Sequence, residues 1–107
     1  LNQVFAESES VRLDDSLLGY ISQLVAETRN HPLLQWGAST RACIALMKTA
    51  RVWALLEWRD FVIPDDIKHL AKPILRHRIE LNPEAQVSEA TEDSVIDDLL
   101  AKVAFPS

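Results

Sequence analysis

The longest helix available to this chain lies in one stretch, because residues 40–58 contain neither glycine nor proline. Apolar residues recur along that stretch at helical spacing, which predicts a helix over residues 40–57. The recurring set is Cys43, Leu46, Met47, Ala50, Trp53 and Ala54. Other apolar positions widen the surface beyond one face, so we expect this helix to be central and covered on several sides. Those positions are Ile44, Val52, Leu55 and Leu56.

The same spacing predicts three more helices, over residues 14–29, 64–78 and 92–104. Their expected caps or first residues are Asp14 or Asp15, Pro64 and Thr91. Pro73 lies inside the second of these helices, where a proline is expected to kink or restart it.

These elements predict a mainly all-α fold, a small bundle of about four helices with a minor two-strand ribbon. We expect the ribbon to pair residues 11–13 with residues 61–63. Residues 30–38 are predicted to be an apolar loop, and residues 80–90 a polar connection to the last helix.

Length and composition indicate a single domain over residues 1–107. A single cysteine, Cys43, excludes an internal disulfide framework and fits a reducing compartment, so we expect a cytoplasmic location. No apolar run approaches the roughly 20 residues needed to cross a bilayer, and no signal-peptide pattern is present. Because the chain begins at Leu1 and not at Met, we expect it to be a piece of a longer protein.

The net charge of −5 is unevenly distributed. Residues 41–78 carry eight Lys or Arg against four Asp or Glu, whereas residues 79–107 carry one against seven. The basic middle could face an anion. A nucleic-acid surface needs a more basic domain, so we expect no nucleic-acid partner.

The sequence lacks the motifs that several kinds of functional site require. Only two glycines are present, Gly19 and Gly37, so neither a GxxxxGK[ST] phosphate loop nor a GxGxxG motif can form. His69 and His77 are eight residues apart, unlike the i, i+4 pair that shares a metal on one helix. Two pairs of adjacent carboxylates, Asp65–Asp66 and Asp97–Asp98, face different directions on a helix and are interpreted as capping and solubilising groups.

The remaining reactive or aromatic side chains are expected to be structural. Cys43 points into the apolar stripe, which favours a small core residue over a nucleophile. Trp36, Trp53 and Trp58 are interpreted as packing anchors and not as stacking platforms. The sequence therefore predicts no metal site and no catalytic group within this chain, and we expect no enzymatic activity from it alone.

Arg41 is the most informative charged residue. Gly37 ends the preceding irregular stretch and Ser39 is a good N-cap, so Arg41 is expected in the first helical turn, pointing outward. A guanidinium there could reach an anion together with the helix N-terminus. Such an arginine is more often a solvated surface charge, and the residues alone leave both interpretations open. Lys48 lies seven residues on, which returns it to nearly the same direction.

Several motifs in order give the chain a family resemblance. They are residues 28–32 (Thr-Arg-Asn-His-Pro), 37–42 (Gly-Ala-Ser-Thr-Arg-Ala), 59–67 (Arg-Asp-Phe-Val-Ile-Pro-Asp-Asp-Ile) and 73–79 (Pro-Ile-Leu-Arg-His-Arg-Ile). Through nearly its full length the chain resembles the C-terminal lid of MoxR-type AAA+ ATPases. Two departures are Thr40, where the family usually has proline, and Trp36, where a smaller apolar residue is common.

The resemblance implies a helical lid over ATP that a separate core domain binds together with Mg²⁺. Arg41 matches the sensor 2 arginine, which contacts the γ-phosphate, with Ser39 and Thr40 at the helix N-terminus beside it. The resemblance also implies an ATPase parent protein, ring hexamers with neighbouring subunits, and chaperone activity on client proteins. Partners carrying a von Willebrand factor A domain are implied as well. The lack of a long apolar run separately predicts that this chain does not insert into a membrane.

Two other interpretations compete with the lid. A free-standing helical protein-interaction module needs only packed amphipathic helices and makes no demand on Arg41. A helical DNA-binding module needs an exposed basic recognition helix, whereas the basic run at residues 76–78 is short and Glu80 follows it closely. A nucleotide-binding core in the same open reading frame would favour the lid over both.

Overall fold

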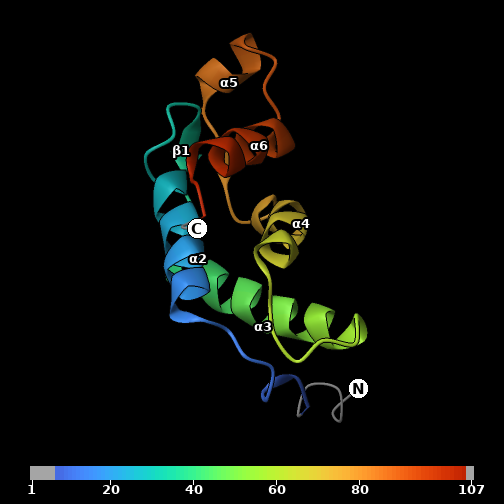
Figure 1. Ribbon diagram of the computed structural model, residues 1–107. Helices are drawn as coiled ribbons and strands as arrows, with labels where there is room; N and C mark the ends of the chain where they lie inside the picture. Colours follow the sequence, from blue (N-terminus) through green and yellow to red (C-terminus); the bar gives the residue numbers. More distant parts are fainter. Residues whose placement is uncertain (1–6, 106–107) are drawn as a thin grey trace.

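The structure is a computed structural model that describes residues 7–105. Helices dominate it, and one short ribbon joins two connecting segments (Figure 1). The elements are α2 (Asp15–Thr28), β1 (Leu34–Trp36), α3 (Thr40–Leu56), α4 (Pro64–Leu75), β2 (Glu80–Leu81), α5 (Pro83–Val87) and α6 (Glu92–Lys102). The mainly helical fold class with a two-strand ribbon is confirmed.

Helix α3 is the scaffold of the bundle, since α2 packs on it at one end and α4 lies along it. Its fully buried residues recur every four positions as Ala42, Leu46, Ala50 and Ala54. Three of the four are alanines, and such small side chains allow neighbouring helices to approach closely. The expected covering on several sides is wrong in part, because Ile44 is 52% exposed and Leu56 is 61% exposed.

Helix α6 closes the bundle by packing on α4 and α2 (Figure 1). Its buried face consists of Val95, Ile96 and Leu99. At its start the Thr91 hydroxyl accepts from the Ser94 N–H at 3.1 Å, which confirms Thr91 as the cap.

All four predicted helices are present, and each ends before its predicted last residue, by one residue in α2 and α3 and by more in α4 and α6. The helix predicted over residues 64–78 stops at Leu75, and the one predicted over residues 92–104 stops at Lys102. Helix α4 runs through Pro73 without interruption. The polar connection expected over residues 80–90 contains β2 and the short helix α5.

The ribbon forms elsewhere than predicted. Strands β1 and β2 pair antiparallel, with Leu34 opposite Leu81, while residues 11–13 and 61–63 share only an isolated parallel bridge between Arg12 and Phe61. The cause is a long-range contact, because Asn82 ties β2 to the loop after α2, about 50 residues earlier in the chain. Its backbone N–H donates to Leu33 O at 2.9 Å.

The three tryptophans differ in burial, which the sequence did not indicate. Trp53 is half-buried against the core, and its ring lies 4.8 Å from that of His69 on α4. Trp36 is 63% exposed and Trp58 is 96% exposed, so the packing role expected for those two is wrong. Trp36 ends β1 and Trp58 lies two residues after α3, and among residues 7–105 no helix or strand covers either ring.

Candidate functional site

The start of α3 has the geometry that the sequence predicts. Ser39 adopts an extended conformation with φ −86° and ψ 175°, and its hydroxyl accepts from the Arg41 N–H at 3.3 Å. The Ala42 N–H donates to Ser39 O at 2.9 Å and closes the first turn. This arrangement confirms Ser39 as the N-cap and Arg41 as a first-turn residue.

Ser39, Thr40 and Arg41 all lie exposed at this helix end. Within residues 7–105 the Arg41 side chain has no hydrogen-bond or ion-pair partner. A shallow hollow beside it is lined by Arg29, Gln35, Trp36, Gly37, Ala38, Ser39 and Thr40. Arg41 itself stands outside this lining. The three residues predicted from the sequence therefore share one helix end, and a charged group remains available there.

The turn that carries these residues is fastened to the last turn of α2. Thr28 is fully buried, and its hydroxyl accepts from the Ala38 N–H at 2.8 Å. The Nε of Arg29 donates to Ala38 O at 3.1 Å. Gly37 lies directly on the same turn, because a Cβ built there would be 2.7 Å from Thr28 O. The contacts of Thr28, Arg29 and Gly37 span about ten residues, and spacing along the sequence does not reveal them.

Cys43 follows two residues after Arg41 and is half-buried against the core. Burial raises the pKa of its thiol, and the nearby Arg29 charge offsets part of that rise. A raised pKa lowers the thiolate fraction at neutral pH. The interpretation of Cys43 as a small packing residue is therefore supported by its surroundings.

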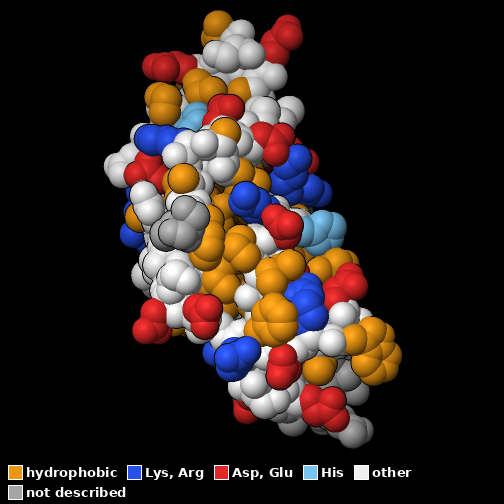
Figure 2. Space-filling view, viewed as in Figure 1, with side chains coloured by type: hydrophobic (Ala, Val, Ile, Leu, Met, Phe, Trp, Pro, Cys, Tyr) orange, Lys and Arg blue, Asp and Glu red, His pale blue; other side chains and the backbone are white. Residues whose placement is uncertain are grey.

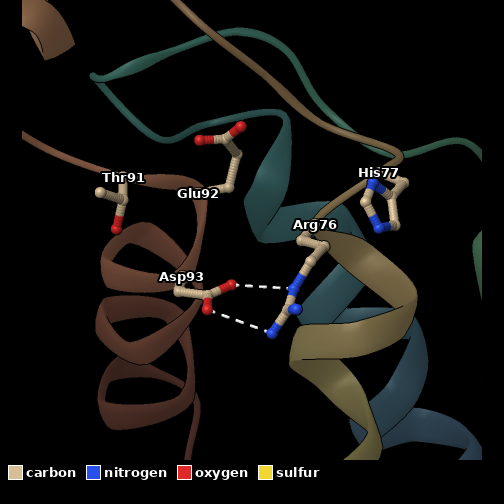
Figure 3. A pocket seen from close by; sticks show the side chains of 5 residues that line it. All are labelled: Arg76, His77, Thr91, Glu92 and Asp93. Atoms are coloured by element: carbon tan, nitrogen blue, oxygen red, sulfur yellow. Dashed lines mark hydrogen bonds and ion pairs between the residues drawn. The ribbon is translucent and has the colours of Figure 1, made fainter.

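A second hollow lies where the end of α4 meets the start of α6 (Figure 3). Arg76 reaches across it to Asp93, with Nε at 3.1 Å from Oδ1 and Nη2 at 3.1 Å from Oδ2. The His77 side chain is turned away from this pair. Because the Arg76 fork already faces a carboxylate, this hollow is a structural junction between two helices.

Metal-ligating and membrane-spanning features are not found in the described part of the chain. Residues 7–105 contain no group of three or more His, Cys, Asp or Glu side chains that could hold a metal ion. None of their helices is both long enough and apolar enough to span a membrane.

Comparison with known proteins gives this geometry a family. A family model described as the AAA lid domain matches residues 26–99. The uncharacterized protein YeaC of Bacillus subtilis (strain 168) is 45% identical over 100 residues, covering 94% of this chain and 31% of that protein. The chaperone MoxR1 of Mycobacterium tuberculosis is 35% identical, covering 85% of this chain and 26% of that protein.

A solved structure agrees with these relatives. The crystal structure of a candidate ATPase from Cytophaga hutchinsonii superposes with a TM-score of 0.89 and 37% sequence identity. The match covers 95% of this chain and 34% of that one. The chain belongs to the AAA lid domain family. Among such domains it is the lid of a MoxR-like AAA+ ATPase, as its motifs indicated. It spans about a third or less of the length of these relatives.

Proposed function

We propose that this domain closes over ATP held by a separate core domain of the same protein, and that Arg41 is its sensor 2 residue. The observation that carries the proposal is the state of Arg41 in the structure. Its guanidinium is exposed and has no partner within residues 7–105, while its backbone belongs to a capped helix turn fastened to α2.

The chemistry of Arg41 fits a γ-phosphate. A guanidinium keeps its charge at every physiological pH and offers a planar fork of donors that matches phosphate oxygens. The helix N-terminus beneath it, with Ser39 and Thr40, adds partial positive charge. Arg41 can therefore favour a triphosphate over a diphosphate, and it can stabilise charge on the transferring phosphoryl group.

In this proposal Mg²⁺ is bound outside the lid. The described residues offer no cluster of carboxylates for it, so we assign the metal and most of the nucleotide contacts to the core domain. When ATP is hydrolysed, Arg41 loses its anionic partner and the angle of the lid can change. The domain would then act as the part that converts nucleotide state into movement.

The surface of the domain supports further contacts of this kind. The large apolar side chains that lie exposed include Trp36, Ile44, Leu56, Trp58, Phe61 and Val87. Figure 2 shows hydrophobic side chains gathered on one face between α2 and α4 and near the end of α3. Contiguous exposed apolar patches are typical of surfaces that meet other protein. We assign these contacts to the core domain and to neighbouring subunits of a ring hexamer.

The name of one relative supports a proposal for the role of the whole protein. That relative is named a chaperone, and we propose that the parent ATPase remodels or activates client proteins in the cytoplasm. Proteins with a von Willebrand factor A domain are the partner class that we would test first. We propose this role in preference to the alternative, a free-standing helical protein-interaction module without nucleotide function.

The test is ATP turnover by the full-length protein carrying Arg41→Ala. Loss of a donor aimed at the transferring group typically lowers kcat by about 10²–10³-fold. Arg41→Lys should not restore full activity, because a point charge does not reproduce the guanidinium fork. Lys48→Ala is the matched control, since Lys48 lies two turns along α3, roughly 10 Å away, and should have a smaller effect.

Two outcomes would contradict the proposal. The first is turnover at the wild-type rate by Arg41→Ala in an assembled ring. The second is an equal loss of affinity for ATP and ADP, because a residue that reads the γ-phosphate changes the affinity for ATP alone.

A further inference from the structure

The turn before α3 is held mainly by α2. Thr28, in the last turn of α2, is completely buried, and its hydroxyl bonds on both sides. It donates its proton to Val25 O and accepts from the Ala38 N–H at 2.8 Å. Ala38 is itself only 1% exposed, so its N–H cannot turn to water instead.

Two further contacts hold the same turn. Arg29 donates from Nε to Ala38 O at 3.1 Å, so the side chains of Thr28 and of the C-cap residue that follows it bind both polar groups of Ala38. Gly37 lies flat against the peptide between Thr28 and Arg29, and a Cβ built at Gly37 would be 2.8 Å from Arg29 N. Backbone cannot move aside as a flexible side chain could, so the approach of the turn to α2 is fixed.

The position of Arg41 depends on the turn before α3. It lies three residues after Ala38, and the cap at Ser39 connects the two. Within residues 7–105 no side chain restrains the Arg41 guanidinium. The direction in which Arg41 leaves the domain is therefore set through its backbone, by the contact between Thr28 and Ala38.

We propose that Thr28 is a positioning residue for Arg41. Through its contact with Ala38, Thr28 holds the start of α3 in the orientation from which Arg41 reaches a nucleotide phosphate. This inference rests on the proposed function. Small displacements of a charged group cost much of its effect, because stabilisation of a developing charge depends on preorganised geometry. The role of Thr28 is thus mechanical, and it acts only through Arg41.

The test is a double-mutant cycle in the full-length ATPase with Thr28→Val and Arg41→Ala. Valine keeps the shape of threonine but removes the hydroxyl, so Ala38 loses its partner. We expect Thr28→Val to lower kcat/KM for ATP by about tenfold, equivalent to about 1.4 kcal/mol. In the Arg41→Ala background the same change should cost less than about twofold.

Three further measurements separate positioning from general damage. Thr28→Ser retains the hydroxyl and should restore most of the activity. Thr49→Val is the matched control on an exposed face of α3 and should leave kcat/KM unchanged. The affinity of Thr28→Val for ADP should stay at the wild-type value while its affinity for ATP falls, because only ATP presents the phosphate that Arg41 reaches.

An equal loss in both backgrounds would overturn the positioning role and leave the sensor role of Arg41 standing. Wild-type turnover by Arg41→Ala alone would overturn the proposed function, and this inference with it. If Thr28→Val does not fold, Thr28→Ala replaces it in the cycle, because it removes the same hydroxyl and leaves the Ala38 N–H without its partner. An additive result with Thr28→Ala would overturn the proposal in the same way.

Discussion

A single buried carboxylate ties the end of α3 to the start of α4. Asp66 is 3% exposed and accepts from Arg59 twice, at 2.8 Å from Nη1 and at 2.6 Å from Nη2. It also accepts from the Ile63 N–H at 2.9 Å, capping α4. This paired carboxylate raises the pKa of Arg59 above its usual range. The capping role expected of Asp66 is therefore confirmed, whereas its burial shows that the solubilising role expected with it is wrong.

Arg59→Met should lower the free energy of unfolding of the domain by about 2–3 kcal/mol. The physical reason is that Asp66 would stay buried while losing its only charged partner among residues 7–105. Urea titration followed by circular dichroism measures the loss. Arg78→Met is the control, because exposed Arg78 donates only to Ile74 O, and it should change stability by less than about 0.5 kcal/mol. Equal effects would contradict the assignment.

At the scale of single residues, the sequence predicts what local rules decide. Ser39 and Thr91 could be identified as caps because an N-cap bonds within three residues of itself. The ion pair between Asp66 and Arg59 and the hydrogen bond from Arg29 to Ala38 O depend on how helices and turns pack together. Spacing along the chain carries no signal for such contacts.

The end of α3 shows an element closed by an unfavourable residue. Trp58 has φ 61°, and the Arg59 N–H closes the helix on Ala54 O at 2.9 Å. This left-handed position normally takes glycine, since side chains there cost about 1 kcal/mol or more. Trp58 is also 96% exposed, so it gains almost nothing from packing within the domain.

Trp58→Gly should therefore raise the free energy of unfolding of this domain by about 0.5–1 kcal/mol, despite the loss of a large side chain. Trp58→Ala is the control, because it removes the ring but keeps the strained backbone. It should leave stability near the wild-type value in the same urea titration. A glycine variant less stable than the alanine variant would show that the ring, and not the backbone, decides.

Helices could be predicted from the sequence far better than the ribbon. Apolar periodicity places α2, α3, α4 and α6 within a few residues, because each buries a face along its whole length. Strands of two or three residues carry no usable period. The pairing of β1 with β2 is set by contacts such as that between Asn82 and Pro32, 50 residues apart.

At the scale of the whole molecule, the domain contains its own core. Buried side chains of α2, α3, α4 and α6 form one cluster, to which Val11 and Val62 also contribute. Ion pairs hold α6 from two sides, with Lys72 on Asp97 at 2.9 Å and Lys102 on Glu27 at 2.9 Å. Exposed pairs of this kind contribute only about 0–1 kcal/mol each, so the apolar cluster dominates.

The purified chain should accordingly fold alone and show no ATP hydrolysis. Its core is built from its own helices, so we expect helical circular dichroism and one cooperative unfolding transition. Hydrolysis requires a phosphate-binding loop, and Gly19 and Gly37 are too few and too distant to form one. Phosphate release with ATP, measured beside an Arg41→Ala control, should equal the buffer blank in both. Hydrolysis above the blank that is lost in Arg41→Ala would show that these residues contain a complete catalytic site. It would contradict the assignment of ATP binding to a separate core domain. A broad, non-cooperative transition would instead show that the exposed apolar side chains must be covered before the helices pack.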